Sequence, residues 1–349
     1  MLANAVKLTD GGWTQRVGAF TALPSLIRQL GADAVETLRA AGLPQDALGL
    51  PDCTISYASL GRLLRLAAER TGCRHVGLLA GRLWHLGDLG LVGEVVRHSP
   101  TVGDALRTLT VYQHLNSGGG LAFLIERPGI VEIGYAIYHA NIEGSIHIYD
   151  VALTSATNFL RELCGPSWTP TEVLLPRERP ADATPWRAFY RVTPRFDAEI
   201  GALRFPSAWM QRPVEGADPE TFRRASRRAD AAGRGEVKQR VMRALRILML
   251  SGDVSGEATA RMLSMHRRTL NRRLQDQGIT FQALLDQVRF ETARQLLEDT
   301  HLSLDDVAAT LGYASVSPFM RSFRRWTGTT PGRWRSGAER TLPEEALAD

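Results

Sequence analysis

Apolar residues recur along the first part of the chain at two spacings, one helical and one alternating. An apolar residue every three or four positions marks FTALPSLIRQLG, YASLGRLLRLAAERTG, TVGDALRTLTVYQHL and IYDVALTSATNFLREL. Between the last two segments, LAFLIE and VEIGYAIY alternate, and Arg127-Pro128-Gly129 forms the turn of a hairpin. Two shorter strand candidates follow, EVLLP around Val173 and ALRFP around Leu203. The pattern predicts one α+β domain over residues 14–218.

The pattern changes after this domain. Residues 219–235 are rich in Arg and Ala and indicate a linker with some helical character. From residue 236 onward no strand pattern appears, so residues 236–337 predict an all-α domain. A chain of 349 residues is long enough for two domains that each bury a core of their own.

Two segments of the all-α region resemble each other. ATARMLSMHRRTLNRRLQ spans residues 258–275, and DDVAATLGYASVSPFMRSFRR spans residues 305–325. Their first helices align at an offset of 48 and their second helices at 49, so the second copy has one extra residue in its turn. Each copy predicts a helix-turn-helix unit, and a duplicated unit can place two helices in successive major-groove segments of DNA.

One long helix is expected between the two copies, from Thr280 to Glu298. At 1.5 Å per residue such a helix spans roughly 28 Å. It would hold the two units about one DNA turn, ~34 Å, apart. We expect Arg289 on this helix to bridge the two halves of the domain; a surface position is the alternative.

The second helix of the first copy has two faces. Leu270 and Leu274 lie four residues apart and are expected in the core. The opposite face is expected to read base edges through Arg267, Arg268, Asn271 and Arg272. Arg273, on the flank, is expected to contact phosphate. Taken alone, this arginine stripe fits a solvated helix face equally well.

The second copy favours DNA over the solvated face. Phe319 and Phe323 occupy the core positions, Ser315 suits the N-cap, and Pro318 falls in the first turn. The residues expected to read bases are Val316, Ser317, Met320 and Arg321, and those expected to contact phosphate are Arg324 and Arg325. Apolar side chains such as Val316 and Met320 suit contact with thymine methyl groups and do not suit a solvated face.

Charge is distributed unevenly between the two regions. Residues 1–218 contain 20 Lys and Arg against 21 Asp and Glu, a net charge of −1, whereas residues 233–337 contain 17 against 10, a net charge of +7. The positive charge therefore lies with the paired helix-turn-helix units, where a polyanionic partner such as double-stranded DNA requires it. The bias toward Arg over Lys can also reflect GC-rich coding.

Other sequence features set limits on location and chemistry. No apolar run of about 18 residues and no signal peptide is present, and three scattered cysteines fit a reduced compartment, so we expect a cytoplasmic protein without membrane contact. The chain lacks a Gly-rich phosphate loop, a G-x-S-x-G elbow and an H-E-x-x-H motif, so we expect no enzyme and no cofactor. A metal site built on His139, His147 and Asp150 is disfavoured by the spacing and by the lack of a fourth ligand.

Candidates for a small-molecule pocket are few. They are polar aromatic residues near helix and strand ends: Tyr112, His114, Tyr138, His139, His147 and Tyr149. Such side chains can orient a ligand in an otherwise apolar cavity. The alternative is that they are surface and capping residues between elements.

The C-terminal motifs resemble those of a known family. SMHRRTLNRRL, QALLDQVRFETARQLL and LSLDDVAATLGYASVSPFMRSFRRWTGTTPGRWR are similar to the DNA-binding domain of AraC-family transcription regulators. Ser264 and His266 depart from the glycine and the N-cap serine that are usual in the first copy. The resemblance implies a domain of seven helices that binds two consecutive major grooves.

The N-terminal region resembles the arabinose-binding-type domain found on a subset of these regulators. The similar pieces are AGLPQDALGLPDCTISYASLGRLL, HVGLLAGRLWHLGDLGLVGEVVRHSPTVGDALRTL and VTPRFDAEIGALRFPSAWMQRPVEGADP. The resemblance implies an effector-binding and dimerisation domain, with an effector of unknown identity. We therefore expect a homodimeric, ligand-responsive regulator, an activator of a catabolic or adaptive operon, with RNA polymerase as a further partner.

Two other functions remain as alternatives. A DNA-repair methyltransferase fused to a regulator would need a zinc-bound cysteine cluster, which Cys53, Cys73 and Cys164 do not supply. An effector-independent DNA-binding protein would not need the long, near-neutral N-terminal region.

Overall fold

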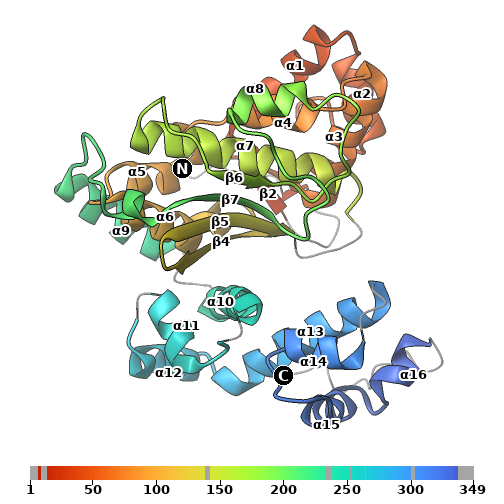
Figure 1. Cartoon of the computed structure of the whole chain (residues 1–349), viewed down its shortest axis with the longest axis vertical. Coiled ribbons are helices and arrows are strands. Elements are labelled where there is room, and N and C mark those ends of the chain that lie inside the picture. The colour runs from red at the N-terminus through yellow and green to blue at the C-terminus, as the bar shows by residue number, and fades with distance from the viewer. Residues whose placement is uncertain are drawn as a thin grey trace. The chain divides into compact units, whose positions relative to one another are not determined.

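The computed structural model describes residues 7–8, 14–137, 142–232, 237–251, 253–263, 265–299 and 303–336. The chain divides into two compact units, residues 1–234 and residues 235–349 (Figure 1). The first contains helices and strands, and every element described in the second is a helix. The N-terminal unit is thus α+β and the C-terminal unit is helical, as the sequence predicts.

A four-stranded antiparallel sheet lies at the centre of the N-terminal unit. Its order is β4 (Gly120–Arg127), β5 (Ile130–Ile137), β7 (Gly201–Pro206) and β6 (Glu172–Leu174). Arg127 pairs with Ile130, so Pro128 and Gly129 form the turn, and Gly129 adopts the left-handed φ of 79° that glycine tolerates. All four strands match segments predicted as strands, the first two from alternation and the others as shorter candidates.

Helices surround this sheet. The α-helices are α1 (Leu23–Gln29), α2 (Ala34–Ala40), α3 (Tyr57–Thr71), α4 (Val76–Arg82), α5 (Leu91–Arg97), α6 (Val102–Tyr112), α7 (Ser145–Cys164), α8 (Thr184–Tyr190) and α9 (Pro219–Ala232). Short 3₁₀ helices are η1 (Gly18–Ala22), η2 (Leu86–Leu89), η3 (Gln113–Leu115) and η4 (Ser207–Gln211). The long helix α7 lies along one face of the sheet (Figure 1).

Helix α4 packs very closely against α7 because two of its residues have no side chain. A Cβ at Gly77 would lie 2.4 Å from the backbone oxygen of His147, and a Cβ at Gly81 would lie 2.6 Å from the Cβ of Thr154. Real Cβ atoms essentially never approach this closely. The two glycines therefore set the distance between the helices, and α7 in turn forms one wall of the unit's interior.

Two parts of this unit differ from the sequence prediction. A three-stranded sheet, in the order β1 (Lys7–Leu8), β3 (Thr54–Ser56) and β2 (Thr14–Arg16), was not predicted, because strands of two or three residues are too short to show alternation. Residues 219–235, predicted as a linker with some helical character, mostly form the helix α9, and this helix packs against α5 and buries Ala225 and Ala229.

The C-terminal unit consists of a series of helices. They are α10 (Val237–Ser251), α11 (Gly256–Met262), α12 (Arg267–Gln275), α13 (Phe281–Asp299), α14 (Leu304–Thr310), α15 (Val316–Thr327) and α16 (Pro331–Arg335). Four residues separate α11 from α12, and five separate α14 from α15. This is the one-residue difference that the alignment of the two copies predicts.

One hydrophobic core joins the two helix pairs, α11–α12 and α14–α15, to α13. Leu270 and Leu274 of α12, Val288 of α13, and Phe319 and Phe323 of α15 are all buried in it. Burying a large apolar side chain stabilises a fold by about 1.5–3 kcal/mol. The helices α12 and α15 are therefore each anchored along one face, which leaves the other face to solvent.

Candidate functional site

The outward face of α12 carries unpaired polar side chains. Arg268, Asn271 and Arg272 are exposed, while Leu270 and Leu274 on the opposite side are 0% and 1% exposed. Among the described residues, no hydrogen bond or ion pair engages these three polar side chains. They can therefore offer guanidinium and amide groups to base edges without breaking an existing contact.

Arg267 differs from its neighbours on the same face. Its guanidinium pairs with the carboxylate of Glu257 on α11, and this contact holds the pKa of Glu257 below its usual value. The Arg267 side chain is still 56% exposed. The pair connects the first turn of α12 to the preceding helix. The N-cap residue of α12, His266, provides no side-chain cap.

Arg273 lies on the flank of α12, also exposed, with its Nη1 atom 3.8 Å from the sulfur of Met265. Its position agrees with the sequence prediction of a flanking residue. Contact of Arg273 with phosphate stays a prediction.

The outward face of α15 is more apolar. Ser317, Met320 and Arg321 are exposed and Val316 is half-buried, while Phe319 and Phe323 are fully buried. Met320 is 39% exposed and is one of three large hydrophobic residues exposed in the described part of the chain. Single exposed hydrophobic residues are ordinary on protein surfaces, so the exposure of Met320 by itself does not show that this face is covered in a complex.

Two arginines follow at the end of α15. Arg324 and Arg325 are exposed, and Nη2 of Arg325 lies 3.0 Å from the Asp286 carboxylate on α13. Both arginines are where the sequence placed them. The ion pair orients Arg325 but does not bury it, since its side chain is 64% exposed.

Arg289 bridges α13 and the turn that precedes α15, as expected from the sequence. Its Nε donates to the carbonyl of Leu311 at 2.9 Å and its Nη2 to the carbonyl of Gly312 at 3.2 Å. The guanidinium also lies 4.3 Å from the centroid of the Tyr313 ring. The second helix pair is thus fixed to α13 by side-chain contacts to its turn.

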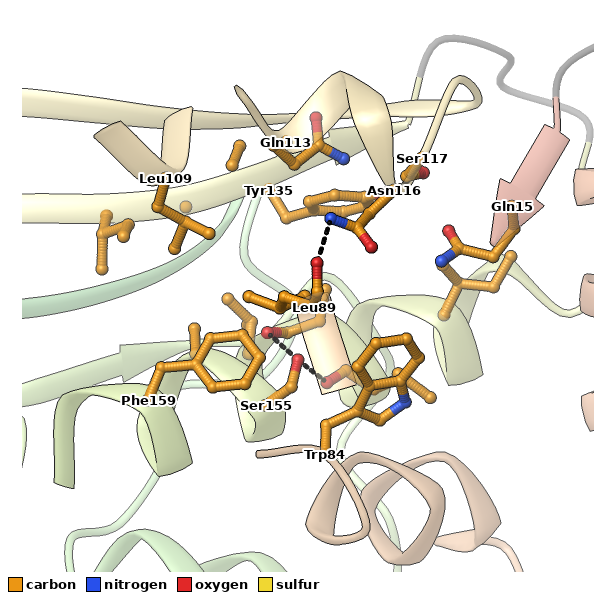
Figure 2. Close-up of a pocket in the computed structure, with 18 of the residues that line it drawn as sticks. Gln15, Trp84, Leu89, Leu109, Gln113, Asn116, Ser117, Tyr135, Ser155 and Phe159 are labelled. Atoms are coloured by element: carbon orange, nitrogen blue, oxygen red, sulfur yellow. Dashed lines mark hydrogen bonds between the residues drawn. The ribbon is translucent and has the colours of Figure 1, made fainter. Parts of the chain in front are cut away.

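A cavity of about 110 Å³ lies inside the N-terminal unit. Its walls are largely apolar and come from elements far apart in the sequence, among them Phe20, Trp84, Leu109, Ile133 and Phe159 (Figure 2). Ala152, Ser155 and Ala156 of α7 contribute another side. A mostly apolar cavity with a few polar groups is typical of a small-molecule site.

Polar side chains gather in one part of this cavity. Gln15, Gln113, Asn116, Ser117 and Tyr135 line it together, whereas Trp84 and Phe159 lie away from this group (Figure 2). An isolated β-bridge between Gln15 and Ser117 holds two of them side by side. The Tyr135 hydroxyl hydrogen-bonds to Ser117 at 3.0 Å and to Tyr57 at 2.9 Å, and burial raises its pKa.

The residues predicted from sequence to bind an effector lie elsewhere. Tyr112 donates from its hydroxyl to Asp230 at 2.9 Å, and His114 Nδ1 lies 2.9 Å from the carbonyl of Val111 in its own turn. The Tyr149 hydroxyl accepts from the Ile137 amide at 3.4 Å. None of these three lines the cavity, and Tyr138 and His139 lie outside the described residues.

His147 is also absent from the cavity lining, because it faces the packed side of α7. It is 5% exposed, and burial together with the charge of Arg177 lowers its pKa to about 4. Nearby, Arg177 pairs with the fully buried Asp150, which also accepts from Trp186 Nε1 at 3.1 Å. Burial raises the pKa of Asp150, and the Arg177 guanidinium opposes this rise. His147 and Asp150 thus belong to the polar interior of the fold.

The sequence analysis missed the cavity residues because most are apolar. Gln113 stands directly between Tyr112 and His114, which are predicted to bind an effector, but Gln113 itself is not predicted to do so. The only signal was a polar run, Gln113 to Ser117, at the end of an amphipathic helix and before an alternating strand.

Two cysteine thiols, those of Cys73 and Cys164, have a shifted pKa, and neither resembles a reactive nucleophile. Burial raises the pKa of Cys73 and raises that of Cys164 to about 12. A nucleophilic cysteine needs the opposite shift, toward the thiolate. Among the described residues, no group of His, Cys, Asp and Glu side chains could hold a metal ion, and no helix could span a membrane.

Comparison with known families decides the class of protein. Residues 31–214, more than half of the chain, match the model described as the arabinose-binding domain of AraC transcription regulators, N-terminal. Residues 259–337 match a helix-turn-helix domain, which includes both α12 and α15. The chain belongs to the AraC family of transcription regulators.

Relatives of this AraC-family protein match along most of its length. The HTH-type transcriptional regulator VirS of Mycobacterium tuberculosis H37Rv is 29% identical over 317 residues, 89% of this chain and 93% of VirS. The ornithine utilization regulator of Pseudomonas aeruginosa is 27% identical over 330 residues, 90% of this chain and 94% of that protein. The crystal structure of the regulator CdpR from Pseudomonas aeruginosa aligns with a TM-score of 0.39 and 26% identity, covering 74% of this chain and 86% of CdpR. This AraC-family member is a DNA-binding transcription regulator.

Proposed function

We propose that α12 and α15 are the recognition helices of two helix-turn-helix motifs that enter successive major-groove segments of double-stranded DNA. The helix α13 acts as the linker between them, and its 19 residues span roughly 28 Å. That length is close to one DNA turn, ~34 Å. In this proposal the DNA-binding domain covers residues 236–337.

One observation carries this proposal. Both α12 and α15 bury one face in a shared core and leave the other exposed, and neither exposed face is a uniform charged surface. On α12 the face offers Arg268, Asn271 and Arg272, which suit guanine and adenine edges. On α15 it offers Ser317, Met320 and Arg321, with the half-buried Val316 beside them, and these side chains suit thymine methyl groups and one guanine. In Arg267 the guanidinium is already paired, so we assign this residue a lesser share of base readout than its neighbours.

Phosphate contacts position the protein on DNA in this proposal. Arg273, Arg324 and Arg325 flank the two base-reading faces and are exposed. Such contacts add affinity without sequence preference. The net charge of +7 over residues 233–337 supplies the accompanying long-range attraction.

The N-terminal domain, residues 14–218, binds a small-molecule effector and dimerises in this proposal. The description of its family model and the apolar cavity support the first part. The regulator would act with RNA polymerase as an activator of a catabolic or adaptive operon in the cytoplasm. The name of the ornithine utilization regulator, a relative over 90% of this chain, supports a catabolic role.

The test of DNA recognition uses the full chain. Duplexes would be selected from a random library, and the dissociation constant of the best one measured by fluorescence anisotropy from 50 to 200 mM salt. We expect log K to fall linearly with log salt, with a slope of about −0.9 per phosphate contacted. Arg272→Ala and Arg321→Ala should each weaken binding about 5- to 140-fold, since a good base contact contributes ~1–3 kcal/mol.

The matched control is Arg39→Ala, which removes an exposed arginine from α2 of the N-terminal unit. It should leave the dissociation constant unchanged. Equal losses for all three variants would reduce the effect to net charge and refute the assignment of α12 and α15.

A further inference from the structure

The lining of the N-terminal cavity carries no formal charge. Among the described residues that form it, there is no Asp, Glu, Lys, Arg or His. The Arg16 guanidinium reaches Asn116 Oδ1 at 3.4 Å, but it is already paired with Asp52 at 2.7 Å. A buried ion needs an opposite charge or several hydrogen bonds to replace its water. The lining therefore disfavours a ligand that is charged in the part it buries.

Most polar groups of the lining are already satisfied. Asn116 Nδ2 donates to the carbonyl of Leu89 at 3.3 Å, and the Ser155 hydroxyl donates to the carbonyl of Val151 at 2.8 Å (Figure 2). The Ser117 and Tyr135 hydroxyls bond to each other. These groups shape the cavity but have little capacity left for a ligand.

Two lining residues differ: the Trp84 indole N–H is buried without a hydrogen-bond partner among the described residues, and Gln113 has a free amide. The Gln113 side chain lines the cavity and the residue is 8% exposed, yet its amide makes no hydrogen bond to the described residues. Its amide atoms are not among the fully buried polar atoms that lack a partner, so they are accessible from the cavity. The amide offers both a donor and an acceptor. The amide is therefore available to a polar group of a bound ligand.

The rest of the lining limits the size and character of that partner. A cavity of about 110 Å³ is smaller than the engineered cavity of about 150 Å³ that binds benzene. Trp84 and Phe159 supply aromatic surface away from the polar group of residues (Figure 2). The space suits one small apolar body, and because the cavity is partly open, the ligand need not fit within it entirely.

We propose that this cavity binds an uncharged small molecule whose apolar body lies against Trp84 and Phe159 and whose single hydrogen-bonding group reaches the Gln113 amide. Alcohols, phenols, amides and lactones are members of this class, whereas amino acids and carboxylates are not. The inference rests on the proposed function, because it names the ligand class of the proposed sensor.

The test compares three probes that share a ring and differ in charge: benzyl alcohol, benzoate and benzylammonium. Their dissociation constants for the full-length protein would be measured by saturation-transfer NMR titration at pH 7.5. We expect benzyl alcohol to bind at least tenfold more tightly than either ion. This comparison needs no variant, so it stands even where a substitution affects folding.

Two variants place the binding in this cavity. Ala156→Leu adds a side chain to its α7 wall and should abolish benzyl alcohol binding, while Ala40→Leu on the exposed surface of α2 should leave it unchanged. Gln113→Met keeps the side-chain length but removes the amide. This variant should weaken the binding of benzyl alcohol about tenfold and leave the binding of toluene unaltered.

The outcomes distinguish an error in the proposed ligand class from an error in the proposed location of the binding site. Tighter binding of benzoate or benzylammonium, lost in Ala156→Leu, would overturn the uncharged class but keep the cavity as the ligand site. Absence of binding by all three probes, or benzyl alcohol binding that survives Ala156→Leu, would overturn the assignment of this cavity. DNA binding measured on the same samples reports independently on the proposed regulator.

Discussion

Removal of the Arg289 guanidinium should loosen the second helix pair without unfolding the protein. Arg289 donates to two carbonyls in the turn between α14 and α15 and lies over the ring of Tyr313. Arg289→Ala would leave the carbonyls of Leu311 and Gly312 without these donors. Because this turn sets the position of α15, its loosening would weaken both local stability and DNA binding.

The magnitude follows from the contacts. A hydrogen bond to a charged group contributes about 1.5–3 kcal/mol, and the half-buried position of Arg289 reduces this to roughly 1 kcal/mol for each bond. The contact with Tyr313 adds roughly 0.5 kcal/mol. The total is about 2–3 kcal/mol, or a factor of roughly 30 to 140 in the opening equilibrium.

Hydrogen exchange read by mass spectrometry measures this directly. Peptides from α14 and α15 of Arg289→Ala should exchange roughly 30- to 140-fold faster than in the wild type, while peptides from α7 should not change. Arg289→Lys is the matched variant, because an ammonium keeps the charge but lacks the planar fork that spans both carbonyls. It should show about half of the free-energy loss. Unchanged exchange in α14 and α15 of Arg289→Ala, or full protection in Arg289→Lys, would refute the reasoning.

Three further predictions concern other parts of the molecule. Arg272→Ala should lose about 1–3 kcal/mol of binding free energy at one base pair and relax specificity there, whereas Arg273→Ala should weaken binding to all sequences evenly and reduce the salt slope by about 1. Anisotropy on a site library measures both effects. A uniform loss for Arg272→Ala would reassign Arg272 to phosphate contact. Burial lowers the pKa of His147 to about 4, so the unfolded state takes up a proton near pH 6.5 while the folded state does not. The stability of the wild type should therefore fall by about 3 kcal/mol between pH 6.5 and 4, and thermal melts of His147→Gln should lack this decrease. Parallel pH profiles of the two proteins would contradict the prediction. Gly77→Ala should destabilise the N-terminal unit by about 1–3 kcal/mol in chemical denaturation, because the added Cβ meets the α7 backbone. Gly87→Ala is the control and should not destabilise the unit, because no atom lies within 4 Å of a Cβ at this position. Equal effects of the two variants would show that α4 can move away from α7.

The helices of the C-terminal unit could be predicted because their information is local and repeated. Leu270 and Leu274 recur as Phe319 and Phe323 in the second copy, and all four are buried. Helical period fixes which side chains lie opposite, so the exposed positions of Arg272 and Arg321 follow from the core positions. The ion pair of Arg267 could not be predicted in the same way, since Glu257 lies on another helix.

The cavity could not be predicted, because it is an absence of packing and not a pattern. Phe20, Trp84, Ile133 and Phe159 have the spacing and character of ordinary core residues, and only their arrangement in space leaves room between them. The prediction instead favoured polar aromatic residues near element ends. In the structure those side chains, such as Tyr112, find partners within the protein fold.

Systematic base substitution across a selected DNA site tests the central claim most directly. Dissociation constants of the full-length wild type, Arg272→Ala and Arg321→Ala would be measured by anisotropy for every single-base change. The account predicts two tracts of base preference centred about 10 base pairs apart, one flattened by Arg272→Ala and the other by Arg321→Ala. A single tract, or loss of the same tract in both variants, would contradict the assignment of α12 and α15 to separate major-groove segments.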